Sequence, residues 1–204
     1  MAPPEGFIYA ENVVAAELWA ELEAWLGSDA SVPWEVATEG RRVAQWGFRY
    51  DYSSHSVDET PVAPIPPLLR RLLAGQAEPS QQRFTQCIVN EYVAGDTDGV
   101  PFHKDDAGFG DTVLVFTFGS PRTLCLRRLA AGAVAAQAPG DQEAEGEVEE
   151  SFRFVPAHLS TYTLAGPARH DWQHSVLPGG ASGDAEAGVR YSITFREKTL
   201  LGSL

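Results

Sequence analysis

The second half of the chain is a succession of short runs rich in β-branched and aromatic residues, with turn-forming segments between them. These runs cover residues 84–92, 112–118, 122–128, 151–155, 158–164 and 189–196. Recurring short strands of this kind are typical of an antiparallel sandwich or barrel. We therefore expect a mainly β fold with flanking helices on its outside.

The first half contains the candidates for those helices and one further strand. Residues 11–27 carry apolar side chains at helical spacing and end at Gly27, which predicts an amphipathic helix. Residues 66–75 begin with Pro and end with Gly, as a short helix does. Residues 41–52 alternate instead, which predicts a strand or hairpin arm. The aromatic face of that strand consists of Trp46, Phe48, Tyr50 and Tyr52.

The charge balance limits the class of partner. The chain has 15 basic and 28 acidic residues, a net charge of −13, whereas nucleic-acid-binding domains usually show a basic surface. A small basic surface remains compatible with this composition because the arginines are clustered. The clusters are Arg41, Arg42 and Arg49, then Arg70 and Arg71, then Arg122, Arg127 and Arg128.

The cellular compartment is constrained by the cysteines and by the N-terminal residues. Cys87 and Cys125 both lie inside apolar strand-like runs, and the first residues lack the basic start and apolar core of a signal peptide. We expect a protein of the cytoplasm or nucleus that is not secreted. No apolar stretch approaches the roughly 20 residues that a membrane helix requires, so we expect no membrane association.

A histidine and a carboxylate stand one residue apart just before a predicted strand. In an extended segment His103 and Asp105 project to the same side and can reach one metal ion together. A histidine and carboxylate spaced this way are weak evidence alone. Candidates for a third ligand are His55, His158, His170 and His174. The context favours His174, which precedes an apolar pair and a Pro-Gly turn. Two histidines and one carboxylate suit non-haem Fe(II), which keeps positions open for a co-substrate and O₂.

The last predicted strand points to an anionic ligand. Its alternation puts Val189, Tyr191, Ile193 and Phe195 on one face, and Arg190, Ser192, Thr194 and Arg196 on the other. Unpaired charges inside a core are very costly, so two inward arginines predict a bound anion. A dicarboxylic acid fits because guanidinium groups bind carboxylates through paired hydrogen bonds.

These motifs resemble the AlkB-like family of Fe(II)/2-oxoglutarate dioxygenases. The matching segments are NEY at 90–92, HKD at 103–105, DWQH at 171–174 and RYSITFR at 190–196. The resemblance implies a double-stranded β-helix (jelly-roll) core at residues 84–204. Residues 1–83 would add helices and a substrate-recognition arm within one structural domain. We expect residues 130–150, which are small, acidic and turn-rich, to form an exposed mobile loop.

The resemblance also implies roles for individual residues. His103, Asp105 and His174 would hold Fe(II), which reacts with 2-oxoglutarate and O₂. Arg190, assisted by Tyr92, would bind the distal carboxylate of 2-oxoglutarate. The other end of the co-substrate, beside the metal, would face Asn90, Ser192 and Arg196, with Ser192 standing where the family usually has Asn.

Three functions are considered for this site: oxidation of a base, oxidation of a protein side chain, and binding without catalysis. In the first, a modified or alkylated base of RNA, tRNA or single-stranded DNA is demethylated or hydroxylated after flipping into the pocket. The second is a protein side chain, which the net charge of −13 favours. The third, a binding module that has lost catalysis, is disfavoured because both the triad and the arginines are intact.

The first class carries specific expectations. The early segments resemble the tRNA wobble-uridine hydroxylase branch somewhat more than the DNA-repair branch. Asp106 continues the motif as in some repair members, but Ala107 departs from it. We expect a monomer that holds nucleic acid through a small arginine and aromatic surface. Its predicted substrate contacts are Arg41, Arg42, Trp46, Tyr50, Tyr52, Asp106 and Trp172.

Overall fold

The structure is a computed structural model. It describes residues 2–28, 30–37, 41–52, 54, 56–76, 83–93, 99–130, 146–178 and 188–199. His55 and most of the acidic segment at 130–150 lie outside the described residues. Among the helices that are described, none has the length and apolar character needed to cross a membrane.

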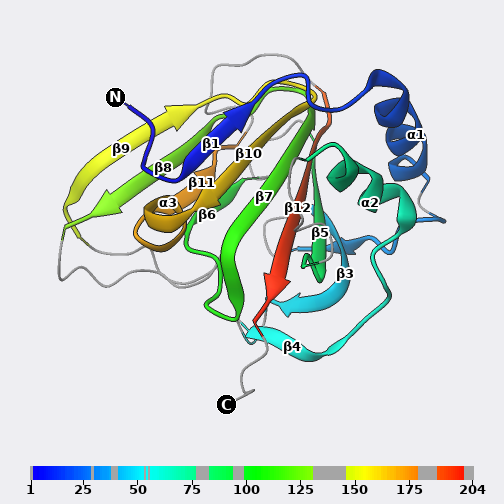
Figure 1. Ribbon diagram of the computed structural model, residues 1–204, viewed down its shortest axis with the longest axis horizontal. Coiled ribbons are helices and arrows are strands. Elements are labelled where there is room, and N and C mark those ends of the chain that lie inside the picture. The colour runs from blue at the N-terminus through cyan, green and yellow to red at the C-terminus, as the bar shows by residue number, and fades with distance from the viewer. Residues whose placement is uncertain are drawn as a thin grey trace.

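In the described part of the chain, eight strands form one large antiparallel sheet (Figure 1). Along the sheet they are β1 (Phe7–Ala10), β10 (Ser160–Ala165), β7 (Phe109–Gly119), β12 (Arg190–Lys198), β5 (Gln86–Tyr92), β3 (Arg42–Asp51) and β2 (Glu35–Val36), with β4 (Ser56–Pro61) paired to β3. β12 lies between β7 and β5, so the strand with the predicted anion-binding arginines is central.

A second, smaller antiparallel sheet contains the other strands that the structure describes. Its order is β6 (Val100–His103), β11 (Gln173–Val176), β8 (Leu124–Leu129) and β9 (Val148–Phe154). One apolar cluster is shared by residues of both sheets, including Val115 and Tyr162 of the large sheet and Leu126 and Val176 of the small one. The predicted mainly β, double-stranded β-helix architecture is thereby confirmed.

Helices α1 (Ala16–Leu26) and α2 (Pro67–Ala74) cover the face of the large sheet that points away from the small sheet (Figure 1). Leu22 and Leu69 from the helices pack with Phe116 and Phe195 of the sheet, and all four are fully buried. Burying an aliphatic or aromatic side chain of this size contributes about 1.5–3 kcal/mol. Both predicted helices are therefore present, although the first begins at residue 16 rather than 11. The short helix α3 (Gly166–His170) joins β10 to β11.

Strand β12 shows the alternation expected from its sequence. Tyr191, Ile193 and Phe195 belong to the cluster beneath the helices. The opposite face, which carries Ser192 and Thr194, lies between the two sheets and lines a pocket. The polar face of this strand therefore points into the sandwich rather than to solvent.

Strand β3 departs from the predicted alternation at Gly47. Trp46 packs on the helix side, with its ring centroid 5.7 Å from that of Trp25, whereas Tyr50 lines the pocket between the sheets. Gly47 has φ +76, and a Cβ there would lie 1.7 Å from the carbonyl oxygen of Thr85. Only glycine tolerates this backbone, and the irregularity moves the residues after it to the other face.

Candidate metal centre and its pocket

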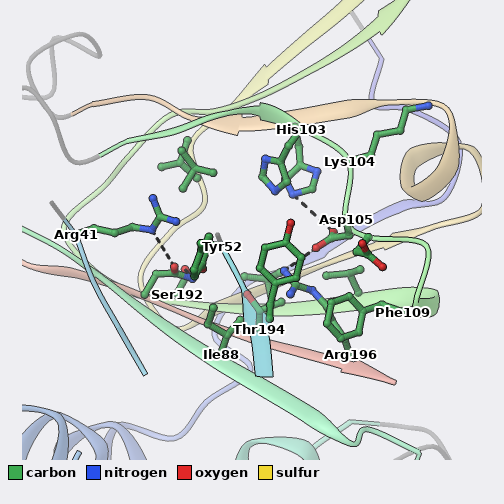
Figure 2. A pocket seen from close by; sticks show the side chains of 18 of the residues that line it. Arg41, Tyr52, Ile88, His103, Lys104, Asp105, Phe109, Ser192, Thr194 and Arg196 are labelled. Atoms are coloured by element: carbon green, nitrogen blue, oxygen red, sulfur yellow. Dashed lines mark hydrogen bonds and ion pairs between the residues drawn. The ribbon is translucent and has the colours of Figure 1, made fainter. Parts of the chain in front are cut away.

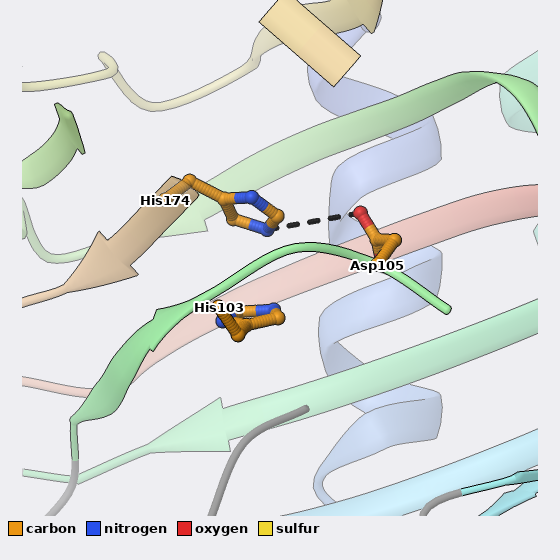
Figure 3. A group of neighbouring side chains, drawn as sticks. All are labelled: His103, Asp105 and His174. Atoms are coloured by element: carbon orange, nitrogen blue, oxygen red, sulfur yellow. Dashed lines mark ion pairs between the residues drawn. The ribbon is translucent and has the colours of Figure 1, made fainter. Parts of the chain in front are cut away.

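Three metal-ligating side chains meet at one end of the small sheet. His103 ends β6 and is the register partner of His174 on the adjacent strand β11, while Asp105 follows in the loop to β7. One ligand atom from each residue lies within 4.8 Å of the others. The imidazole centroids are 4.2 Å apart, and His174 Nε2 lies 3.8 Å from Asp105 Oδ2 (Figure 3).

The structure places two of the alternative histidines, His158 and His170, elsewhere. His158 is exposed, and its Nδ1 accepts a hydrogen bond of 2.9 Å from the backbone N–H of Gly119. His170 is half exposed and contacts Asp111 at 3.2 Å. The choice of His174 as the third ligand is consistent with this geometry.

Burial keeps the two imidazoles neutral. Desolvation, together with the neighbouring His103, lowers the pKa of His174 to about 3. Desolvation likewise lowers the pKa of His103, whose Nδ1 lies 2.9 Å from the carbonyl oxygen of Pro101. A neutral imidazole with Nδ1–H donated to a carbonyl leaves the Nε2 lone pair for a metal. At neutral pH the contact between His174 and Asp105 is therefore not an ion pair.

Asp105 supplies the negative charge of the centre. Burial alone would raise the pKa of this carboxyl group, but the Arg196 guanidinium and the surrounding cationic groups hold it below its ordinary value. Arg196 Nη2 lies 2.6 Å from Asp105 Oδ1. The other oxygen, Oδ2, is buried and has no hydrogen-bond partner among the described residues. A buried carboxylate oxygen beside two neutral imidazoles fits a divalent metal ion with nitrogen and oxygen ligands.

A second unsatisfied group lies on β12. Arg190 is fully buried, and its Nε and Nη1 have no hydrogen-bond partner in the described part of the chain. Its guanidinium lies 4.9 Å from the ring centroid of Tyr92, and Nη2 is 3.5 Å from the hydroxyl of Thr117. A buried cation with unused donors fits an anionic ligand.

One pocket holds the metal ligands and reaches the Tyr92 ring that contacts Arg190. Its wall includes the three metal ligands, and Figure 2 shows His103, Asp105, Arg196, Tyr52 and Arg41 around it. Tyr92 lines the pocket, whereas Arg190 does not reach its surface. Most of the predicted site residues meet here: Arg41, Tyr50, Tyr52, Asn90, Tyr92, His103, Asp105, Asp106, His174, Ser192 and Arg196.

Residues 12–196 match the model of the 2OG-Fe(II) oxygenase superfamily. The chain belongs to this superfamily. With the triad of His103, Asp105 and His174 in place, it is an Fe(II)/2-oxoglutarate-dependent oxygenase.

Solved structures agree with this assignment at the level of the fold. The structure of OsALKBH1 superposes with a TM-score of 0.61 at 15% identity, covering 97% of this chain and 100% of that one. An oxidoreductase of the 2OG-Fe(II) oxygenase family from Burkholderia pseudomallei gives a TM-score of 0.54 at 14% identity, covering 95% of this chain and 85% of that one. No curated protein matches the chain. The expected closeness to the wobble-uridine hydroxylase branch is not supported by these comparisons.

Two predicted substrate contacts lie outside the pocket of this oxygenase. Trp46 belongs to the core beneath the helices. The irregularity at Gly47 is the reason that Trp46 and the later Tyr50 lie on opposite faces of the strand. Trp172 is buried in the apolar cluster between the sheets and does not line the pocket, which corrects its expected place as a substrate contact.

The two arginines expected on the nucleic-acid-binding surface are also placed differently. Arg41 is only 2% exposed, and its guanidinium donates to Asn90 Oδ1 and to the Gly99 carbonyl oxygen, each at 3.1 Å. Arg42 forms a two-pronged ion pair with Glu91. Arg41 is therefore an interior residue of the pocket, and Arg42 is already neutralised by a carboxylate.

Sequence reasoning missed Thr117 and Tyr162 beside Arg190. Thr117 contacts the guanidinium, and Tyr162 lines the pocket with its pKa raised by burial. They come from β7 and β10, and their meeting with β12 depends on strand order. Local sequence carries no signal for that order, although the inward positions of each strand follow from its alternation.

The residues of this site prepare it for oxidation chemistry. When bound, Fe(II) and 2-oxoglutarate supply the oxidation of a C–H bond by O₂, coupled to decarboxylation of the co-substrate. The chain offers two neutral imidazoles and an ionised carboxylate on one side of the pocket. From β12, the Arg196 guanidinium lies beside Asp105 in the pocket. Arg190, buried against the Tyr92 ring, has unused donors that can bind a carboxylate.

Proposed function

We propose that this oxygenase demethylates or hydroxylates a modified base of RNA or single-stranded DNA. The observation that carries the proposal is the position of Tyr50 and Tyr52, which line the same pocket as the iron ligands. Their ring centroids are 5.2 Å apart in an edge-to-face arrangement. Enzymes that act on a base extrude it from its stack and hold it between aromatic side chains.

Polar groups at the pocket support the same substrate. Arg41 and Lys104 contribute cationic donors to its wall, and Asp106 contributes a carboxylate. Donors and an acceptor around flat aromatic walls suit the hydrogen-bonding edge of a base.

A protein side chain is the second candidate substrate. The net charge of −13 favours it because an acidic surface repels a phosphate backbone. Arg42 and Arg49, both ion-paired with glutamates, do not add a free basic surface.

Binding of a methylated single-stranded oligonucleotide tests the proposal. Tyr50→Ala should weaken binding by about 1–3 kcal/mol, roughly 5- to 150-fold, if the ring stacks on a base. Tyr50→Phe should bind as the parent does. Tyr9→Ala, a change in β1 away from the pocket, serves as the control.

Succinate release decides between the two substrate classes. We expect methylated RNA or single-stranded DNA to stimulate release, with the mass of the product showing loss of methyl or gain of oxygen. If the parent binds no nucleic acid at low salt, and peptides or protein extract stimulate release instead, the protein-oxidising function replaces the one proposed.

A further inference from the structure

A buried arginine outside the pocket contacts the loop that carries Asp105. Arg169 lies in α3, is only 4% exposed and points at the segment between β6 and β7. Its Nη1 donates to the carbonyl oxygen of Asp105 at 3.1 Å. Its Nη2 donates to those of Asp106 at 2.8 Å and Phe109 at 3.3 Å, and its Nε to that of Gly110 at 3.4 Å.

The contacted segment has little support from strand pairing. Residues 104–108 lie between the end of β6 and the start of β7, outside any strand. Within the segment, the Asp106 carboxylate accepts from the backbone N–H of Gly108 at 2.6 Å, and the Asp106 carbonyl accepts from that of Phe109 at 3.1 Å. These bonds shape the turn, but they do not fix the backbone of Asp105 relative to the rest of the metal centre.

The other end of Arg169 is tied to the third ligand. α3 leads directly into β11, where His174 stands five residues after Arg169. The helix is anchored by a bond of 2.9 Å from the N–H of Ala168 to the carbonyl oxygen of Glu5. A second link joins the same two segments, since Lys104 Nζ donates to the carbonyl oxygen of His170 at 2.7 Å.

We infer that Arg169 is a positioning residue of the metal centre, fixing the backbone of Asp105 relative to His174. A guanidinium group presents its donors in a rigid plane, so one side chain can hold several carbonyl groups in a fixed arrangement. Groups that orient metal ligands typically change metal affinity 10- to 100-fold when they are replaced. The inference depends on the iron centre alone and is independent of the substrate class.

Arg169→Lys tests this role, because an ammonium group keeps the charge but cannot span the same carbonyls. Calorimetric titration of the metal-free variant with Mn²⁺ should show a Mn²⁺ affinity about 10- to 100-fold below that of the parent. Higher Mn²⁺ concentrations should restore full occupancy. Val32→Ala is the matched control, since it trims a side chain that is 3% exposed in the core beneath the helices.

The melting temperature separates positioning from general support of the fold. Val32→Ala should lower the melting temperature of the metal-free protein and leave Mn²⁺ affinity unchanged. If Arg169→Lys lowers the melting temperature but binds Mn²⁺ as the parent does, the inference is overturned. Should Arg169→Lys fail to fold, Lys104→Met removes the second link. It should then weaken Mn²⁺ binding several-fold, and unchanged binding would equally overturn the inference.

Discussion

Arg190→Met should have opposite effects on co-substrate binding and on the stability of the metal-free protein. The substitution keeps an unbranched side chain of similar length and removes the charge. If a carboxylate of 2-oxoglutarate occupies the unused donors Nε and Nη1, two charge-assisted hydrogen bonds are lost. At about 1.5–3 kcal/mol each, the loss is about 3–6 kcal/mol. That corresponds to at least about 100-fold weaker binding.

The ligand-free protein should not suffer from the same change. Arg190 leaves two buried donors unsatisfied, and each such group costs about 1–3 kcal/mol. The substitution forfeits the contact with the Tyr92 ring, which contributes about 0.5–2 kcal/mol. The free energy of unfolding should therefore be unchanged or raised by up to about 5 kcal/mol. This sign is unusual, because replacing a satisfied buried arginine normally destabilises a protein.

Two measurements check the pair of effects: calorimetric titration of 2-oxoglutarate into the Mn²⁺-loaded protein without O₂, and urea unfolding of the metal-free protein. Arg122→Met is the matched control, because Arg122 is 3% exposed and donates to the Val93 carbonyl oxygen at 2.8 Å. It should lower stability and leave 2-oxoglutarate affinity as it was. Unchanged affinity in Arg190→Met would refute the reasoning and assign the dicarboxylate to Arg41 or Arg196, which do line the pocket.

Three further predictions follow from the site and from β3. Replacing His103, Asp105 or His174 by Ala should abolish Mn²⁺ binding and succinate release while leaving the circular dichroism spectrum unchanged. If one of these variants binds Mn²⁺ as the parent does, the replaced residue is not a metal ligand. Because the pKa of His174 is about 3 in the folded protein against 6.5 for the free group, the unfolded chain binds more protons between those values and acid lowers stability. The free energy of unfolding of the metal-free protein should fall by up to about 2 kcal/mol between pH 7 and pH 5, and less in His174→Gln. Gly47→Ala should lower the melting temperature markedly, since its φ of +76 and the adjacent backbone exclude a Cβ. Gly75→Ala should change little, because φ there is ordinary and a Cβ would make only a normal contact of 3.8 Å with the Val13 carbonyl oxygen.

The sequence was most informative where a motif and a strand period coincide. The alternation of β12 could be predicted because the strand is unbroken, and it places Arg190 and Arg196 on the face opposite Phe195. The close spacing of His103 and Asp105 needed only an extended backbone. His174 required its context along the chain, and the register of β11 with β6 agrees with that choice.

The errors have identifiable physical causes. A strand period holds only until a residue with positive φ interrupts it, and nothing in the sequence distinguishes Gly47 from a glycine with ordinary dihedral angles. Arg41 belongs to an arginine cluster and is therefore expected at the surface. Its burial depends on the long-range approach of Asn90 and Gly99, which local sequence does not reveal. The contacts of Arg169 are with backbone carbonyl groups, which every residue type carries. They leave no motif in the sequence.

The division of the centre between two sheets has a consequence for how the sandwich moves. His103 and His174 belong to the small sheet, whereas Arg190 and Arg196 belong to the middle of the large one. A metal and an anion bound to each other across the pocket would therefore act as a non-covalent cross-link between the layers. Binding of the metal and the anion should reduce the motion of one sheet relative to the other. A ligand that binds only when both sheets are in place shifts the equilibrium toward that arrangement. Changes that loosen the apolar cluster shared by the two sheets, which includes Val115 and Leu126, would then impair loading before they impair folding.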